Sequence, residues 1–165
     1  MIIRILIAAA LQLAVLSTGA IAGSGDLYRS ISPNQLLNIL SSERGRIDID
    51  ETESDTTLEG RVAGADYSVY FYECDGAGFT DPARPNSECL GFEYRAYFSG
   101  FGKDLATVNQ WNIDYHYGSL WQDGDDLVLQ LNVVVEGGIT EENIGITFLW
   151  WKAVIDSFYD FMEQN

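Results

Sequence analysis

The 165-residue sequence predicts an α+β fold of two layers, in which an antiparallel sheet carries flanking helices over one face. Three observations predict it. Residues 90–98 place apolar side chains at every second position, which is typical of a half-buried antiparallel strand. Asp123-Gly124 separates two further strand-like segments and is a strong signal for a tight hairpin. Residues 140–163 place apolar side chains along one wide helical face. The expected order is a helix, three or four strands, a helix, two strands and a helix, which with three strands is α-β-β-β-α-β-β-α.

The N-terminal segment, residues 1–22, has the pattern of a signal peptide. Arg4 precedes an apolar run over residues 5–16, which is short for a transmembrane span. Small residues follow at the two positions that a signal peptidase reads, so we expect cleavage between Ala22 and Gly23. The alternative is an uncleaved N-terminal anchor. Cleavage places the mature chain in the periplasm or outside the cell, without a membrane span.

Composition limits the function classes. The chain has 9 basic residues, 25 acidic residues and one histidine, for a formal charge of −16. Removal of Arg4 with the signal peptide makes the charge −17, from 8 basic and 25 acidic residues. Such an acidic chain has the wrong sign for nucleic acid or an anionic membrane surface. One histidine excludes multi-histidine metal sites, and the pattern calls for no cofactor. After a short leader over residues 23–31, residues 32–165 form one domain.

The first half of the domain predicts one helix and three strands. Ser32 can cap a helix with Pro33 at its first position, running to about Ser42. Strand patterns follow at residues 47–50, 58–62 and 67–72, the last rich in β-branched and aromatic residues.

The second half predicts a strand, a helix, two strands and a final helix. Asp104 can cap a helix whose apolar face includes Leu105, Val108, Trp111 and Tyr115. Strands are expected at residues 117–121 and 126–136, and Thr140 can cap the last helix. The main apolar stripe of that helix is Ile144, Phe148, Trp151, Ile155, Phe158 and Met162.

Cys74 and Cys89 are the only cysteines, and an exported chain favours a disulfide between them. They enclose a loop rich in Gly, Pro, Asp and Asn, and a bridge at its base limits the loop entropy. A redox-active pair is the alternative, but the wide spacing and the acidic neighbours oppose it.

Several motifs together resemble one known family. They are residues 69–74, 89–98, 108–112, 117 with 125–127, and 135–144. The most specific are the Asn109-Gln110-Trp111-Asn112 segment and the Gly-Gly-Ile-Thr sequence at residues 137–140. Together they resemble the YbjN domain family of bacterial proteins, labelled sensory transduction regulators, over residues 32–161. The resemblance implies a fold like that of type III secretion chaperones, often dimeric, with no established catalytic activity. One departure is His116, which stands where a basic residue is usual.

Individual site candidates each have a structural alternative. Asn109 and Asn112 can present amides to a partner or can bridge to the next strand. His116 has no neighbouring nucleophile in the pattern, so no catalytic residue is assigned. The acidic runs at residues 48–55 and 123–126 can hold Ca²⁺ or form a solvated face, and the second lacks the distant bidentate Glu of a calcium loop.

Trp150, Val154 and Phe161 flank the main stripe of the last helix. If the sheet covers only that stripe, a homodimer or a bound polypeptide must cover these three. Otherwise the curved sheet or another helix buries them. We therefore expect an exported, non-enzymatic domain with a protein-interaction, chaperone-like or regulatory role. The rivals are a small extracytoplasmic ligand-binding or hydrolytic domain that uses an acidic and aromatic surface, and a cytoplasmic regulator that keeps residues 1–22.

Overall fold

The computed structural model describes residues 27–41, 47–51, 55–75, 83–101 and 104–164. The expected signal peptide, the cleavage site at Ala22 and Gly23, and part of the acidic run at residues 48–55 lie outside these ranges. The helices are α1 (Pro33–Ser41), α2 (Leu105–Asp114) and α3 (Glu141–Gln164). The strands are β1 (Leu27–Tyr28), β2 (Ile47–Glu51), β3 (Thr56–Val62), β4 (Ala65–Cys74), β5 (Cys89–Phe98), β6 (Ser119–Asp123), β7 (Asp126–Val134) and β8 (Ile139–Thr140).

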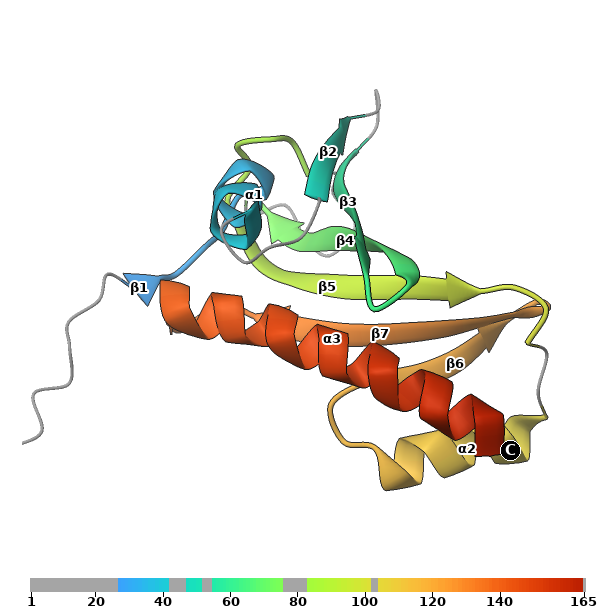
Figure 1. Cartoon of the computed structure of the whole chain (residues 1–165). Coiled ribbons are helices and arrows are strands. Elements are labelled where there is room, and N and C mark those ends of the chain that lie inside the picture. Colours follow the sequence, from blue (N-terminus) through green and yellow to red (C-terminus); the bar gives the residue numbers. More distant parts are fainter. Residues whose placement is uncertain (1–26, 42–46, 52–54, 76–82, 102–103, 165) are drawn as a thin grey trace, which may run out of the picture.

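Six strands form an antiparallel sheet in the order β2-β3-β4-β5-β7-β6, and β1 pairs with β8 beside it. Helix α3 runs along one face of the sheet, with α1 near its start and α2 near its end (Figure 1). The other face carries no helix in the described part of the chain. The expected α+β fold of two layers is confirmed. The β1–β8 pair was not predicted and places Leu27 and Tyr28 of the expected leader in a strand.

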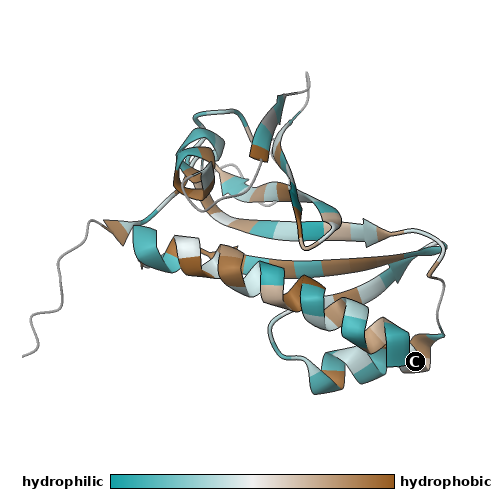
Figure 2. Cartoon of the chain, viewed as in Figure 1, coloured by the Kyte–Doolittle hydropathy of each residue, from teal (hydrophilic) through white to brown (hydrophobic). Residues whose placement is uncertain are grey.

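The main stripe of α3 is buried against the sheet as predicted, and Met162 at its end is partly buried. Figure 2 shows the alternation of apolar and polar residues along α3 and the long strands. Tyr94 of β5 stacks on Trp151 with ring centroids 5.7 Å apart, and Tyr67 of β4 meets Trp151 edge-on at 6.2 Å. Such aromatic pairs add about 0.5–1.5 kcal/mol each beyond the area that they bury.

Glycine makes room for one of these rings. Gly60 of β3 lies directly opposite Tyr67 in the register. A methyl group at Gly60 would lie 2.5 Å from the Tyr67 ring, so the absence of a side chain lets the ring lie over the neighbouring strand.

Polar caps begin the helices where the sequence predicts them. The Ser32 hydroxyl accepts from the Gln35 backbone N–H at 3.2 Å, and the Gln35 side chain accepts from the Ser32 N–H at 2.8 Å. Asp104 accepts from the Thr107 N–H at 2.8 Å, and Thr140 accepts from the Asn143 N–H at 3.2 Å. Each pair satisfies a backbone donor that the first turn leaves open.

Leu105 departs from the expectation. Leu105 is 68% exposed, and the buried residues of α2 are Val108 and Trp111 alone. The first expected strand of the second hairpin starts at Ser119 rather than at residue 117. The Trp111 indole N–H donates to the Gly118 carbonyl at 2.8 Å, which draws residues 117–118 toward α2 and away from the sheet.

The predicted disulfide between Cys74 and Cys89 is present, with an S–S distance of 2.12 Å. The two cysteines are directly opposite each other in β4 and β5, so the bridge closes the base of residues 75–88. Next to it, the Asp75 carboxylate accepts from the Ser87 hydroxyl at 2.6 Å and from the Glu88 N–H at 2.9 Å. These two hydrogen bonds lower the pKa of Asp75.

Candidate functional site

Strand β7 is longer than its neighbour β6, and this difference leaves an open edge. Ser119, the first residue of β6, lies opposite Gln130, and β7 continues to Val134. Among the described residues, no strand pairs with residues 131–134 on that side. On the other side, the Val135 N–H donates to the Leu90 carbonyl of β5 at 2.8 Å. Since hydrogen-bonding direction alternates along a strand, the backbone groups of Asn132 and Val134 point to the open side.

A hollow of about 420 Å³ lies between this edge and α3. We call it the edge groove. Its wall on one side is β7, and on the other side α3 and the loop before β6. The lining residues are His116, Tyr117, residues 131–134, Ile146, Thr147 and Trp150.

The rim of the edge groove is apolar and exposed. The rings of Tyr117 and Trp150 meet edge-on, with centroids 3.8 Å apart. Tyr117 is 61% exposed and Trp150 39% exposed. Ile146 lies one helical turn before Trp150, and exposed Leu149 lies on the same side of α3. Exposed aromatic and aliphatic side chains around a hollow are typical of protein-binding surfaces.

The structure separates the three expected contact residues of α3. Trp150 is at the rim of the edge groove, whereas Val154 and Phe161 are buried within the chain. Val154 packs on Gly118, where even one added methyl group would collide with it. Phe161 meets the Trp111 ring at 5.4 Å and the Tyr115 ring at 5.9 Å. Helix α2 and the loop after it therefore cover two of the three residues.

The two asparagines of α2 also have different settings. The Asn112 side chain donates to the Leu120 carbonyl at 2.8 Å and accepts from the Leu120 N–H at 2.9 Å. Asn112 is therefore the bridge from α2 to β6, which is the structural alternative for this residue. Asn109 is exposed on α2. His116 lies in the loop after α2, where it borders the edge groove and a polar depression lined by Asn112 and Asn132.

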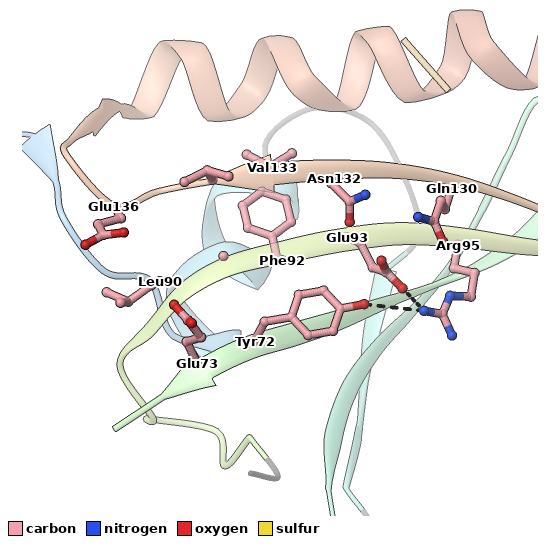
Figure 3. A pocket seen from close by; sticks show the side chains of 12 residues that line it. Tyr72, Glu73, Leu90, Phe92, Glu93, Arg95, Gln130, Asn132, Val133 and Glu136 are labelled. Atoms are coloured by element: carbon pink, nitrogen blue, oxygen red, sulfur yellow. Dashed lines mark hydrogen bonds and ion pairs between the residues drawn. The ribbon is translucent and has the colours of Figure 1, made fainter. Parts of the chain in front are cut away.

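The helix-free face of the sheet carries a charged and aromatic cluster. Arg95 forms an ion pair with Glu93 and donates to the Tyr72 hydroxyl at 3.4 Å (Figure 3). It also donates to the Tyr97 hydroxyl at 3.2 Å. Its guanidinium lies 4.6 Å from the centre of the Tyr70 ring. Burial and the neighbouring Glu93 raise the pKa of Tyr72.

The alternation along residues 90–98 puts Glu93 on the face of β5 opposite the apolar stripe, but Glu93 is only 3% exposed. The outward row of β5 is thus an internally paired cluster. Beside it is a second hollow of about 480 Å³, the outer depression, which shares Asn132 and Val134 with the edge groove. Glu73 and Glu136 lie at its other end (Figure 3).

The described residues include no group of three His, Cys, Asp or Glu side chains placed to hold a metal ion. Of the acidic runs, Asp123 and Asp126 pair across the β6–β7 hairpin, and Asp48 and Asp50 are exposed on β2. No described helix is long and apolar enough to cross a membrane. A disulfide is compatible with a location outside the cytoplasm.

Fold and site together define an α+β domain with a one-sided helical layer and an apolar groove at an open strand edge. The sequence model of the YbjN family, described as a putative bacterial sensory transduction regulator, matches residues 32–164. The chain belongs to the YbjN family. This family is not a known enzyme family and supports a regulatory or interaction role. A search of curated proteins found no match.

Sequence reasoning found Trp150 but missed Tyr117, Ile146 and the edge of β7 as parts of one site. A signal was present, because the two strands expected around Asp123-Gly124 differ in length by six residues. A hairpin of unequal strands leaves the longer one without a partner unless a further element covers it.

Proposed function

We propose that the chain is an exported, non-enzymatic YbjN domain that binds a polypeptide partner through the edge groove, with a regulatory or chaperone-like role. The observation that carries the proposal is the exposed Tyr117–Trp150 pair, which lies over a groove at an open strand edge. Aromatic residues are enriched among those that contribute most to binding at protein interfaces. The regulatory description of the family agrees with this role.

Export rests on two independent features. Residues 1–22 have the pattern of a signal peptide, and the disulfide between Cys74 and Cys89 is stable in an oxidising compartment. Cell fractionation with mass spectrometry of the intact protein tests it. We expect a chain outside the cytoplasm that begins at Gly23 and contains no free thiol. A full-length, reduced chain in the cytosol would refute export.

Site-specific photo-crosslinking in cells tests the binding site. A photoreactive amino acid replaces Ile146, which lines the edge groove, or Asp160, which is exposed further along α3. We expect covalent polypeptide adducts from position 146 and none from position 160. Adducts of the same mass and yield from both positions, or from neither, would contradict the proposal. An adduct of twice the chain mass would identify a homodimer in place of a separate partner.

A small-ligand or hydrolytic site on the helix-free face has less support. The aromatic side chains there are occupied by Arg95, which lies over the Tyr70 ring and 5.8 Å from the Trp121 ring. The Glu93 carboxylate is paired with the same guanidinium. The groups that a sugar or an acid–base reaction would use are thus engaged within the fold.

A further inference from the structure

The open edge of β7 presents backbone groups in the arrangement that a further strand requires. Asn132 and Val134 direct their N–H and C=O groups away from β5, on the side where β6 has ended. Exposed strand edges of this kind pair readily with another chain. We infer that the edge groove receives one extended segment of a separate polypeptide, with alternating apolar and basic side chains, as an added antiparallel strand along residues 131–134. This inference rests on the proposed function and specifies its partner.

Space for such a strand exists on both faces of the sheet. The edge groove and the outer depression both border Asn132 and Val134, one from the helical side and one from the helix-free side. An added strand would continue the line of β6 from the point where Ser119 ends it. All pairings in this sheet are antiparallel, so an added strand that runs antiparallel to β7 would keep the hydrogen-bonding pattern of the sheet.

The two faces set the chemistry of the segment, because successive side chains of a strand point to opposite faces. Side chains on the helical side would meet Ile146, Trp150 and Tyr117, so they should be apolar. Side chains on the other side would lie toward the outer depression, where Glu136 follows β7 and where the Arg95 guanidinium is already paired with Glu93. The mature chain carries −17, so basic side chains are favoured there.

A second copy of the chain fits this edge poorly. A two-fold antiparallel pairing centred on Val133 would join only residues 132–134 of each copy, because β7 ends at Val134. A pairing centred on Asn132 would place Val134 of one copy opposite Gln130 of the other, a position that Ser119 of the same chain already fills. Two chains of charge −17 also repel each other. A separate segment, which has no β6 of its own, avoids both problems.

The test uses the full mature chain and the synthetic peptide acetyl-Lys-Val-Lys-Val-Lys-Val-amide. In an antiparallel pair, directly opposite residues share a face, so the lysines would lie opposite Asn132 and Val134 and would make the backbone hydrogen bonds. N-methylation of the three lysine amides should lower the affinity at least tenfold. N-methylation of the three valine amides is the matched control and should change the affinity less than threefold.

Replacement of the lysines by glutamate should also lower the affinity at least tenfold. Equal affinities of the two N-methylated peptides would overturn strand addition and leave the proposed function standing, since the peptide would then bind without backbone pairing. Failure of the parent peptide to bind at millimolar concentration would overturn the inferred segment chemistry. The crosslinking experiment decides the proposed function independently.

Variants of the edge test the same inference from the side of the protein. Val134→Pro removes one outward N–H from a 72% exposed residue, whereas Val134→Ala keeps that N–H and shortens the side chain. We expect about a tenfold loss of affinity for V134P, in line with one lost hydrogen bond, and less than threefold for V134A. Amide hydrogen exchange does not depend on either variant folding. The peptide should slow exchange at Asn132 and Val134 and leave Val133 unchanged, and no slowing at these two amides would refute the inference.

Discussion

At the scale of single residues, two positions in this fold depend on what lies directly against them. Gly118 has no side chain because Val154 of α3 occupies that space. Glu93 is a carboxylate with almost no contact with water, and Arg95 on the same strand neutralises it. Both residues look unremarkable in the sequence, where Gly118 falls inside the strand expected at residues 117–121 and Glu93 on the strand face opposite the apolar stripe. Each is set by a neighbour in the fold.

Gly118→Ala should destabilise the chain by about 1–3 kcal/mol, because the added methyl group collides with Val154 and the local packing must shift. Urea unfolding measures the loss. The control is the same substitution in a Val154→Ala background, where the space is free. There Gly118→Ala should cost less than half as much, and an equal cost in both backgrounds would contradict the packing explanation.

Glu93→Gln should lower the free energy of unfolding by about 2 kcal/mol, since it leaves the partly buried Arg95 charge without its carboxylate. The matched change is Glu59→Gln on β3, where the carboxylate accepts from the Ser68 hydroxyl at the surface. That change should cost less than about 0.5 kcal/mol. If both variants unfold at the same urea concentration, the Glu93–Arg95 pair is not a stabilising element.

At the scale of elements, the sequence predicted most of the architecture, because the spacing of apolar residues along a helix or strand depends on which side of it is buried. The stripe of α3 and the alternation of β5 follow from the side that each element buries. The cap residues Ser32, Asp104 and Thr140 were predicted because helix starts need local hydrogen-bond acceptors.

The candidate site was predicted only in part. Trp150 was assigned to a contact surface, but the burial of Val154 and Phe161 depends on how α2 packs beside α3, and helical periodicity carries no information on that packing. The Trp111 indole holds Gly118 beside α2 by a hydrogen bond. The chain therefore joins the sheet only at Ser119, and the edge of β7 beyond that point stays open. Both features arise from contacts between elements.

The disulfide joins β4 to β5 at the base of residues 75–88. Cys74→Ser/Cys89→Ser should lower the free energy of unfolding by about 3 kcal/mol, the loss expected for a loop of this length. Reduction of the unmodified chain with dithiothreitol should have the same effect. Guanidinium unfolding of the oxidised, reduced and double-serine forms measures both. A double-serine form as stable as the oxidised chain would show that the bridge contributes nothing to stability.

At the scale of the whole molecule, one aromatic core joins the sheet to α3, and this predicts alkaline instability. Burial raises the pKa of Tyr67 and Tyr94 in this core, and of Tyr72 on the helix-free face, above the ordinary value near 10. Below pH 10 these phenols are neutral in both states. Above it they ionise in the unfolded chain but resist ionisation in the folded one, so stability falls as the pH rises.

Urea midpoints from pH 8 to pH 11.5 should therefore decrease only above about pH 10. Tyr67→Phe removes one of the three groups and should make the decrease shallower. A midpoint that stays constant to pH 11.5 would contradict the burial of these phenols.

The isolated chain is expected to keep an open, unpaired edge at residues 131–134, ready for a partner. Residue-resolved amide hydrogen exchange of the free chain over residues 23–165 tests this most directly. Leu131 and Val133, whose N–H groups face β5, should exchange slowly, and Asn132 and Val134 should exchange at least a hundredfold faster. Equal protection of all four amides in the free chain would show that the edge is already occupied and would contradict the claim.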